Sequence, residues 1–212
     1  MVRMGRWNGV LAAALALMLN GLPAALRAQD DPAQAQLKAL NQQAIQLYER
    51  GEYQKATDLF EQVVELANKT LGPDHPALAT SLNNLAELYK KQGRYAEAEP
   101  LYQRSLKIWE AKLGPDHPDV AQSLNNLAQL YREQGRYAEA EPLHKRSLKI
   151  KEAKLGPDHP DVATSLNNLA ILYYTQGRYA EAEPLFKRSL EIWEAKLGPD
   201  PYAKLKARSP EV

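Results

Sequence analysis

Three histidines recur at equal intervals in this sequence, each within the phrase LGPDHP and beside an aspartate. Histidine is the commonest metal ligand in proteins and the side chain that titrates nearest neutral pH. A metal site or an acid–base centre would need these side chains gathered at one point. A fixed interval of 42 residues instead assigns them to successive copies of one unit, which stacking spaces along an edge. Each histidine is therefore predicted to serve its own turn: they are His75, His117 and His159.

The remaining chemistry-bearing residues are few. There is no cysteine, so thiol nucleophiles and thiolate metal sites are excluded. Of eleven glycines, eight follow residue 28 and fall at turns between repeated phrases, which leaves none for a phosphate-binding loop. His144 stands where equivalent positions hold Tyr102 and Phe186, so we expect a partly buried ring rather than a base. The sequence predicts no enzyme, no cofactor and no metal.

Two further phrases, QGRYAEAEPL and SLNNLA, share the 42-residue period, and each occurs in three identical copies. A catalytic motif needs only one copy, whereas a period of about 20–50 residues is typical of solenoids and arrays. Gly51 keeps the same step as the glycines of the longer phrase, so the chain holds four units, the first of them divergent. We divide it into a lead at 29–36, repeats at 37–76, 77–118, 119–160 and 161–200, and a tail at 201–212.

Apolar periodicity predicts two helices in each unit, as the third repeat illustrates. A glycine with positive φ commonly ends a helix, which is the role predicted for Gly135. The second helix is predicted to end before Gly156. The first helix carries one apolar stripe, at Val120, Leu124, Leu127, Ala128 and Tyr131. The second buries another, at Ala140, Leu143, His144, Ser147 and Leu148.

The phrase QGRYAEAEPL is predicted to form the hinge of this helical hairpin. In the second repeat Gly93 turns the chain, Tyr95 packs across the turn, and Ala98 is small enough for the two helices to approach closely. Glu97 and Glu99 favour a helix N-terminus electrostatically.

Residues near the helix ends carry expectations of their own. Asp158 is predicted to cap the first helix of the fourth repeat, whose first turn tolerates the nearby proline. Pro142 must lie near the first turn of its helix, or it will kink that helix. Trp109 and Trp193 share a position with Lys151. This position is predicted near the surface of the second helix, either packing in part on the neighbouring repeat or offering a platform to a partner.

The first 28 residues have the layout of a secretory signal peptide. Arg3 and Arg6 precede an apolar run of about ten residues, whereas a membrane-spanning helix needs about twenty. Cleavage after Ala28, or alternatively after Ala25, would export the chain to a periplasm or the exterior without a stable membrane anchor; an uncleaved anchor is the other interpretation. Removing 1–28 leaves 24 basic and 26 acidic residues, which gives no electrostatic case for binding nucleic acid.

Asparagines recur on the first helix of each repeat, although they oppose helix formation. Each disfavours a helix interior by about 0.6 kcal/mol relative to alanine, so the seven together cost about 4 kcal/mol. Hydrogen bonds between neighbouring repeats, at about 1 kcal/mol each, would offset this cost, and we expect them for the second asparagine of each pair. The first asparagines are Asn41, Asn83, Asn125 and Asn167, and the second are Asn84, Asn126 and Asn168.

The pattern resembles the tetratricopeptide repeat over about residues 37–200. The signature positions hold Leu82, Leu85, Ala86, Tyr89, Gly93, Tyr95, Ala98 and Tyr102 in the second repeat. The period of 42, the LGPDHP linkers and the EAEPL phrase are similar to the kinesin light chain variety. The first repeat departs from it, with Val63 and Val64 in place of Ser-Leu and Asp58 in place of the proline.

The resemblance implies an all-α fold, a right-handed superhelical array of helix–turn–helix repeats known as an α-solenoid. The first helices would line its concave groove. Such an array would act as a non-catalytic module that binds a protein or peptide. In the family, groove asparagines hold the backbone of a bound peptide, which would be the role of the first asparagines here.

Differences among repeats two to four cluster on one face of the first helix, at positions i, i+3 and i+4. Because the core and turns barely differ, specificity for a ligand would reside on this face; drift on a solvated surface is the alternative. The predicted groove residues are Glu87, Gln129 and Ile171; Lys90, Arg132 and Tyr174; and Lys91, Glu133 and Thr175.

The character of these residues suggests a ligand. Lys90 and Arg132 offer positive charge, and Ile171 and Tyr174 offer apolar surface. We expect an extended peptide, acidic at one end and apolar at the other, similar to the acidic, tryptophan-containing cargo peptides of kinesin light chains.

Two alternatives concern the array as a whole. The tail offers only Tyr202 and Leu205 as a weak apolar pair for a capping helix. The end of the array could stack on another copy, which would make a structural, self-assembling protein. The chain could equally be a truncated relic of a longer multidomain protein.

Overall fold

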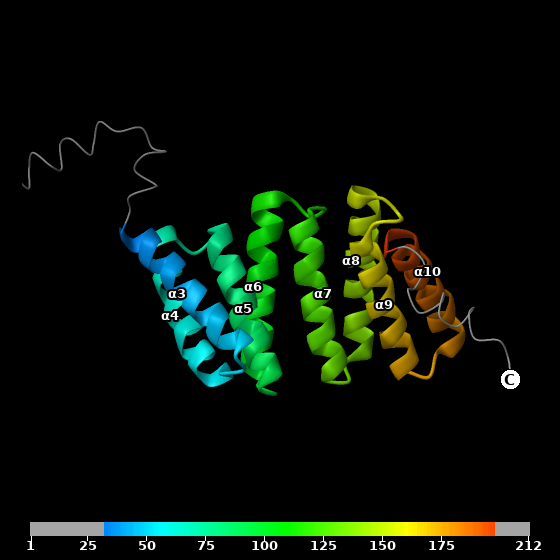
Figure 1. Cartoon of the computed structure of the whole chain (residues 1–212), viewed down its shortest axis with the longest axis horizontal. Coiled ribbons are helices and arrows are strands. Elements are labelled where there is room, and N and C mark those ends of the chain that lie inside the picture. The colour runs from blue at the N-terminus through cyan, green and yellow to red at the C-terminus, as the bar shows by residue number, and fades with distance from the viewer. Residues whose placement is uncertain (1–31, 198–212) are drawn as a thin grey trace, which may run out of the picture. The chain divides into compact units, whose positions relative to one another are not determined.

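The computed structural model describes residues 32–197, all of whose regular elements are helical. The predicted signal peptide and tail lie outside these residues. The chain divides after Thr70 into two compact units, which are considered separately below. The described part contains eight helices (Figure 1): α3 (Pro32–Glu49), α4 (Tyr53–Leu71), α5 (Pro76–Lys91), α6 (Tyr95–Leu113), α7 (Pro118–Glu133), α8 (Tyr137–Leu155), α9 (Pro160–Thr175) and α10 (Tyr179–Leu197).

The first unit contributes the hairpin of α3 and α4. Its helix α3 begins at Pro32, inside the segment that the repeat pattern assigns to the lead. Gly51 lies between the two helices with φ of 76°, a conformation that glycine adopts without steric penalty. The buried apolar side chains of this unit are Ala44, Ala56, Phe60, Val63 and Ala67.

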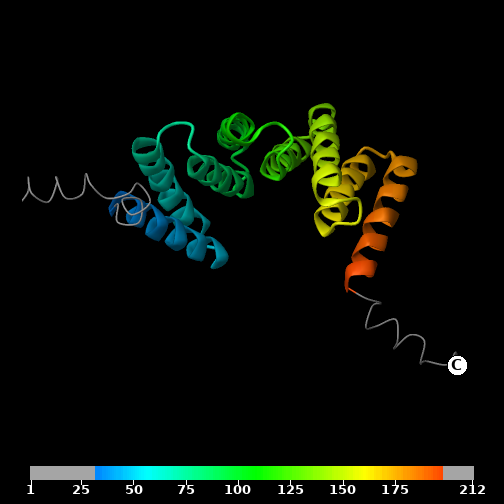
Figure 2. The same ribbon diagram turned by 90° about the horizontal axis from the view of Figure 1, so that it is seen from above.

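The second unit is a stack of three hairpins, α5–α6, α7–α8 and α9–α10. Each helix packs against the next one in the chain, and the first helices α5, α7 and α9 also contact one another in series. Figure 2 shows these hairpins following one another along the unit. The all-α repeat prediction is confirmed for the described residues.

The predicted apolar stripes form the core of the third repeat. All five residues of the first-helix stripe are at most 7% exposed. On α8, Ala140, His144 and Ser147 are buried, and Leu143 packs against the cluster around Val120 and Leu124. Leu148 instead packs against the cluster around Val162 of the following hairpin. The second-helix stripe therefore serves both the hairpin's own core and the joint to its neighbour.

The turn after α7 has the geometry predicted for Gly135. Gly135 has φ of 74°, its N–H donates to Arg132 O at 3.0 Å, and the N–H of Arg136 donates to Tyr131 O at 2.8 Å. These two bonds form a Schellman motif, which satisfies carbonyls at the end of the helix. A Cβ on Gly135 would meet nothing within 4 Å, so the backbone conformation, rather than space, requires glycine here.

Each linker histidine is the N-cap of the helix that follows it. Nδ1 of His159 accepts the N–H of Asp161 at 3.1 Å, and His75 and His117 do the same on their own helices. The prediction that each histidine serves its own turn is confirmed, whereas the prediction of Asp158 as the cap is wrong. His159 directly precedes Pro160, and a residue before proline is held in the extended region that an N-cap requires.

Pro142 is the sixth residue of α8, just beyond the first turn, and α8 runs as one helix from Tyr137 to Leu155. Its missing N–H leaves the carbonyl of Ala138 without the usual helical donor. Pro100 and Pro184 occupy the same place on α6 and α10.

His144 is buried more completely than predicted, at 1% exposed, and neither ring nitrogen has a hydrogen-bond partner among the described residues. Burial, and then the positive charges of Arg132 and Lys151, lower its pKa from 6.5 to about 4. The equivalent Tyr102 is also buried, but its hydroxyl donates to Glu87 Oε2 at 2.8 Å. The third repeat thus buries a neutral imidazole without a hydrogen-bond partner at the position where the second repeat buries a hydrogen-bonded tyrosine.

This ring should make the protein sensitive to mild acid. Because the folded-state pKa lies below the unfolded value, unfolded chains bind the proton first, and stability falls as the pH drops from about 6.5 to about 4. The loss from this one group approaches about 3 kcal/mol. His144→Phe, which copies Phe186, should raise the free energy of unfolding by about 1 kcal/mol or more at pH 7. In denaturant unfolding, the advantage of the variant should widen at acid pH; an advantage independent of pH would contradict this account.

Candidate functional site: the exposed face of the first helices

One side of each first helix of the second unit stays open to solvent or only half-buried. Residues at i, i+4, i+7 and i+11 form this side, as a helical stripe does. It includes some of the predicted groove positions together with the second asparagines. We call it the first-helix face, made of Thr80, Asn84, Glu87 and Lys91 on α5, Gln122, Asn126, Gln129 and Glu133 on α7, and Thr164, Asn168, Ile171 and Thr175 on α9.

The asparagines form a ladder between hairpins. Asn83 Oδ1 accepts from Asn126 Nδ2 at 2.9 Å, and Asn125 Oδ1 accepts from Asn168 Nδ2 at 2.9 Å. The predicted inter-repeat bonds of the second asparagines are confirmed for these two pairs. At about 1 kcal/mol each, they offset much of the propensity cost of about 0.6 kcal/mol for each of the four residues.

The first asparagines turn out to share this ladder. Asn125 is only 4% exposed, and the next residue, Asn126, is more exposed. Asn83 and Asn167 are half-buried, as is Asn41 on α3 in the first unit. Contact between the first asparagines and a bound peptide stays a prediction. In the structure, the second asparagine of the pair Asn125–Asn126 lies nearer the surface than the first.

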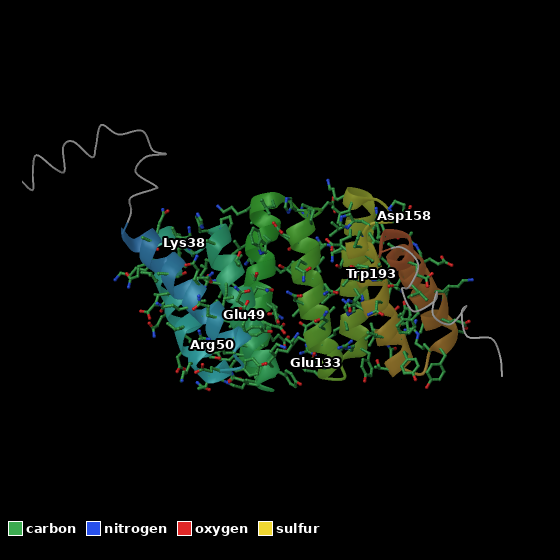
Figure 3. All side chains as sticks on the ribbon, viewed as in Figure 1. Lys38, Glu49, Arg50, Glu133, Asp158 and Trp193 are labelled. Atoms are coloured by element: carbon green, nitrogen blue, oxygen red, sulfur yellow. The ribbon has the colours of Figure 1, made fainter. Side chains whose placement is uncertain are left out.

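The predicted positive charge at Lys90 is not displayed on the surface. Lys90 is 7% exposed, and its Nζ lies 2.8 Å from Glu87 Oε2, the same oxygen that accepts from Tyr102. A buried lysine must be paired, because an isolated charge is too costly to desolvate. Arg132 is half-buried beside Glu133, which lies at the end of α7 (Figure 3), with 4.0 Å between Nη2 and Oε1.

On α9, Ile171 of the face and the adjacent Tyr174 supply the apolar surface that was predicted, whereas Thr164, Asn168 and Thr175 of the same face are polar. Tyr174 is 58% exposed and meets Tyr179 edge-on, with ring centroids 5.1 Å apart. Ile171 is half-buried one turn away, and the Thr175 hydroxyl donates to Leu172 O at 2.8 Å. An aromatic ring this open is a contact surface that neither α5 nor α7 offers at the equivalent position.

Part of the variation among repeats follows the core behind the face. Glu87 on α5 binds the buried hydroxyl of Tyr102, whereas α9 has Ile171 where the ring behind is Phe186, which has no hydroxyl. An acid thus accompanies a phenol, and an aliphatic residue accompanies a phenyl ring. This fixed offset of 15 residues is visible in the sequence, but the sequence alone does not identify it as a packing pair.

Successive hairpins are also joined at their hinges, by contacts between a glutamate, an arginine and a tyrosine that sequence reasoning missed. Glu141 on α8 accepts from Arg178 at 2.6 Å and from the Tyr173 hydroxyl at 3.1 Å. The Arg178 guanidinium also lies 4.1 Å from the centre of the Tyr173 ring. We call this arrangement the clasp; Glu99, Tyr131 and Arg136 repeat it one hairpin earlier.

The clasp gives a structural role to two residues that every copy of the hinge phrase contains, its arginine and its second glutamate. Glu99 was assigned to helix N-terminal electrostatics, yet its carboxylate serves the following hairpin. The hydrogen bonds from Arg178 and then Lys145 lower the pKa of Glu141 to about 2, so this acid stays ionised through mild acidity. The glutamate and the arginine of a clasp lie in consecutive copies of the hinge phrase, so changing either residue breaks the contact between two hairpins.

The position shared by tryptophan and lysine also belongs to the joint. Trp109 packs against the cluster around Val120 and Leu124 of the next hairpin, which confirms partial packing on the neighbour. Lys151 is only 5% exposed, so the expectation of a surface position is wrong there. Burial lowers the pKa of Lys151, and the nearby charge of Asp161 on α9 counteracts this.

No group of three or more potential metal ligands occurs among residues 32–197. Within the same residues, no helix is long and apolar enough to cross a membrane.

Removing the clasp acid should loosen the stack. Glu141→Gln keeps the shape but replaces a charge-assisted contact, so we expect the free energy of unfolding to fall by about 1–2 kcal/mol. Glu97→Gln is the matched control, because Glu97 pairs with Arg94 inside one hairpin at an exposed site and should change stability by less than about 0.5 kcal/mol. Equal effects of the two substitutions in denaturant unfolding would show that the clasp does not hold the hairpins together.

Comparison with known proteins agrees with this geometry. A tetratricopeptide repeat model matches residues 35–106, 78–153 and 131–195. BtubC (BKLC) from P. vanneervenii is similar in structure, with a TM-score of 0.73 and 25% identity over 96% of this chain and 80% of that one. A Podosopora anserina protein described as a putative kinesin light chain with nearly identical TPR-like repeats gives TM-scores of 0.68, for a form with one substitution, and 0.65.

Both Podosopora anserina structures are 28% identical to this chain and cover 89% of it and 86% of their own chains. Among curated proteins, no sequence matches this chain. The resemblance to kinesin light chain-like repeats is thereby confirmed at the level of fold. The three matched segments run together from residue 35 to residue 195, and the protein belongs to the tetratricopeptide repeat family.

Proposed function

We propose that this protein is an exported, non-catalytic interaction module that holds an extended segment of a partner along the first-helix face of α5, α7 and α9. The observation that carries the proposal is the change in character of this face along the stack. It is polar and charged on α5 and α7, whereas on α9 it includes the aliphatic Ile171, which lies beside the 58% exposed ring of Tyr174 at the edge of the face. The caps, turns and clasps of the same hairpins are nearly identical.

The packing behind the face narrows the ligand that it fits. Glu87 and Lys90 neutralise each other, so the positive charge offered to an acidic segment comes from the exposed Lys91 on α5 and the half-buried Arg132 on α7. The Arg132 guanidinium is positioned at the end of α7, one hairpin before Tyr174. The expected ligand has an aromatic or aliphatic side chain for α9 and a carboxylate about one repeat away, toward α7.

Selection of random displayed peptides tests this ligand directly. Peptides selected on residues 29–212 should contain an apolar residue and should lose at least about tenfold in affinity, or about 1.4 kcal/mol, to Ile171→Gln/Tyr174→Arg. That variant copies the residues of the third repeat, so the hairpin can accommodate them. Lys149→Glu copies the fourth repeat on an exposed site of α8 and should leave affinity unchanged.

Two results would count against binding on this face. Peptides held equally by the variant and the wild type would place the site elsewhere on the molecule. Selected peptides whose affinity survives scrambling of their charges would remove the acidic end of the proposed ligand. Circular dichroism of each variant shows whether a loss of affinity reflects a loss of fold.

Export rests on residues 1–28, which lie outside the described residues. Expression of the whole chain in a bacterium should yield protein outside the cytoplasm, because the apolar run after Arg3 and Arg6 directs secretion. N-terminal sequencing of that protein should read from Gln29, or from Leu26 if cleavage follows Ala25. A cytoplasmic product beginning at residue 1 or 2 would overturn this part of the proposal.

A further inference from the structure

One side of α10 carries the residues that, on α6 and α8, are covered by the following hairpin. Leu106 and Leu148 pack against the next core, whereas the equivalent Leu190 is 58% exposed. Trp109 packs in the same joint, whereas Trp193 (Figure 3) is 36% exposed. Among the described residues nothing covers this surface. The side of α10 that corresponds to the packed sides of α6 and α8 is therefore exposed.

The surface is hollowed and carries charges of both signs. An open depression of about 670 Å³ is lined by Tyr174, Tyr179, Phe186 and Leu190 together with Glu183 and Lys187. We call this surface the α10 face. Exposed apolar area bounded by charged groups is typical of protein–protein contacts.

The clasp on this face is incomplete. On α8, the equivalent acid Glu141 binds Arg178 and also Lys145, whose Nζ lies 2.6 Å away. On α10, Glu183 and Lys187 form no ion pair with each other or with another described residue. An acid and a lysine one turn apart therefore stand available on the same face of a helix.

Stacking the first repeat of a second copy on this face would not complete the clasp. The clasp needs a tyrosine and an arginine from the incoming hairpin, as Tyr173 and Arg178 supply. The first repeat has Leu47 and Glu52 at those two positions of the 42-residue register. Glu52 would bring a second carboxylate toward Glu183, so head-to-tail stacking is disfavoured by like charge.

The α10 face is instead complementary to itself. If two α10 helices cross antiparallel about a twofold axis midway between residues 183 and 187, each Glu183 meets the Lys187 of the other copy. The same axis brings Tyr179 of one copy toward Leu190 of the other, so apolar surface covers apolar surface. An isologous contact of this kind closes on itself and gives a dimer rather than a fibre.

We propose that the α10 face pairs two copies of this chain into a symmetric dimer, held by reciprocal Glu183–Lys187 ion pairs around apolar contacts of Tyr179, Leu190 and Trp193. The depression on this face includes Tyr174, which the proposed peptide also contacts, so a dimer and a peptide would compete for that ring. Glu183 and Lys187 lie outside the first-helix face, so charge exchange at these two residues tests the dimer separately from peptide binding.

Charge exchange tests the dimer specifically. Mature chain 29–212 should show a mass that rises with concentration to twice that of the monomer in sedimentation equilibrium. Glu183→Lys and Lys187→Glu should each weaken dimerisation by at least about tenfold, since each opposes like charges at two symmetric places. The double variant E183K/K187E should recover dimerisation, and K149E should leave it unchanged.

The other outcomes overturn the proposal. The wild-type chain 29–212 could stay monomeric while a shortened form that ends at residue 197 dimerises. That result would show that residues 198–212 of the same chain cover the α10 face. A monomer in both forms would leave no role for a second copy there. Mass that grows beyond a dimer would indicate head-to-tail stacking, and single variants that dimerise like the wild type would place any contact elsewhere. Circular dichroism confirms that each variant is folded.

Discussion

The ion pair between a second-helix glutamate and the arginine of the next hairpin is the interaction on which the stacking of α5–α10 depends. Glu99 and Glu141 are each only partly exposed, so their carboxylates need partners within the protein. Each obtains an arginine and a tyrosine from the hairpin that follows. A hairpin that changed its hinge alone would leave its neighbour's acid unpaired, which links the sequences of adjacent repeats.

The features that sequence predicted well are those that a single hairpin determines. The stripe of Val120, Leu124 and Tyr131 and the turn at Gly135 follow from helical periodicity and from the one residue that accepts positive φ. The all-α stack follows from repetition of that hairpin. None of these features depends on how far a helix rotates against its neighbour.

The predictions that failed depend on a neighbour or on a rotation of a few tens of degrees. Asp158 and His159 are adjacent in the linker, and only the extended backbone before Pro160 selects the histidine as cap. Lys90 occupies a position that could face solvent, but Glu87 draws it into a buried pair. The face of each asparagine, and the clasp itself, similarly require two hairpins in contact. The differences among repeats two to four therefore have two sources. Some residues differ because of what the exposed face could bind, and others differ because of the core side chain packed behind them.

The regular spacing of these joints has a mechanical consequence. Both joints of the second unit contain a clasp and an asparagine hydrogen bond, so a force that pulls on the chain ends would meet these contacts one joint after another. Detaching one repeat of 42 residues releases about 150 Å of extended chain, at about 3.6 Å per residue. A stack of this kind is expected to lengthen joint by joint under load rather than in one rupture.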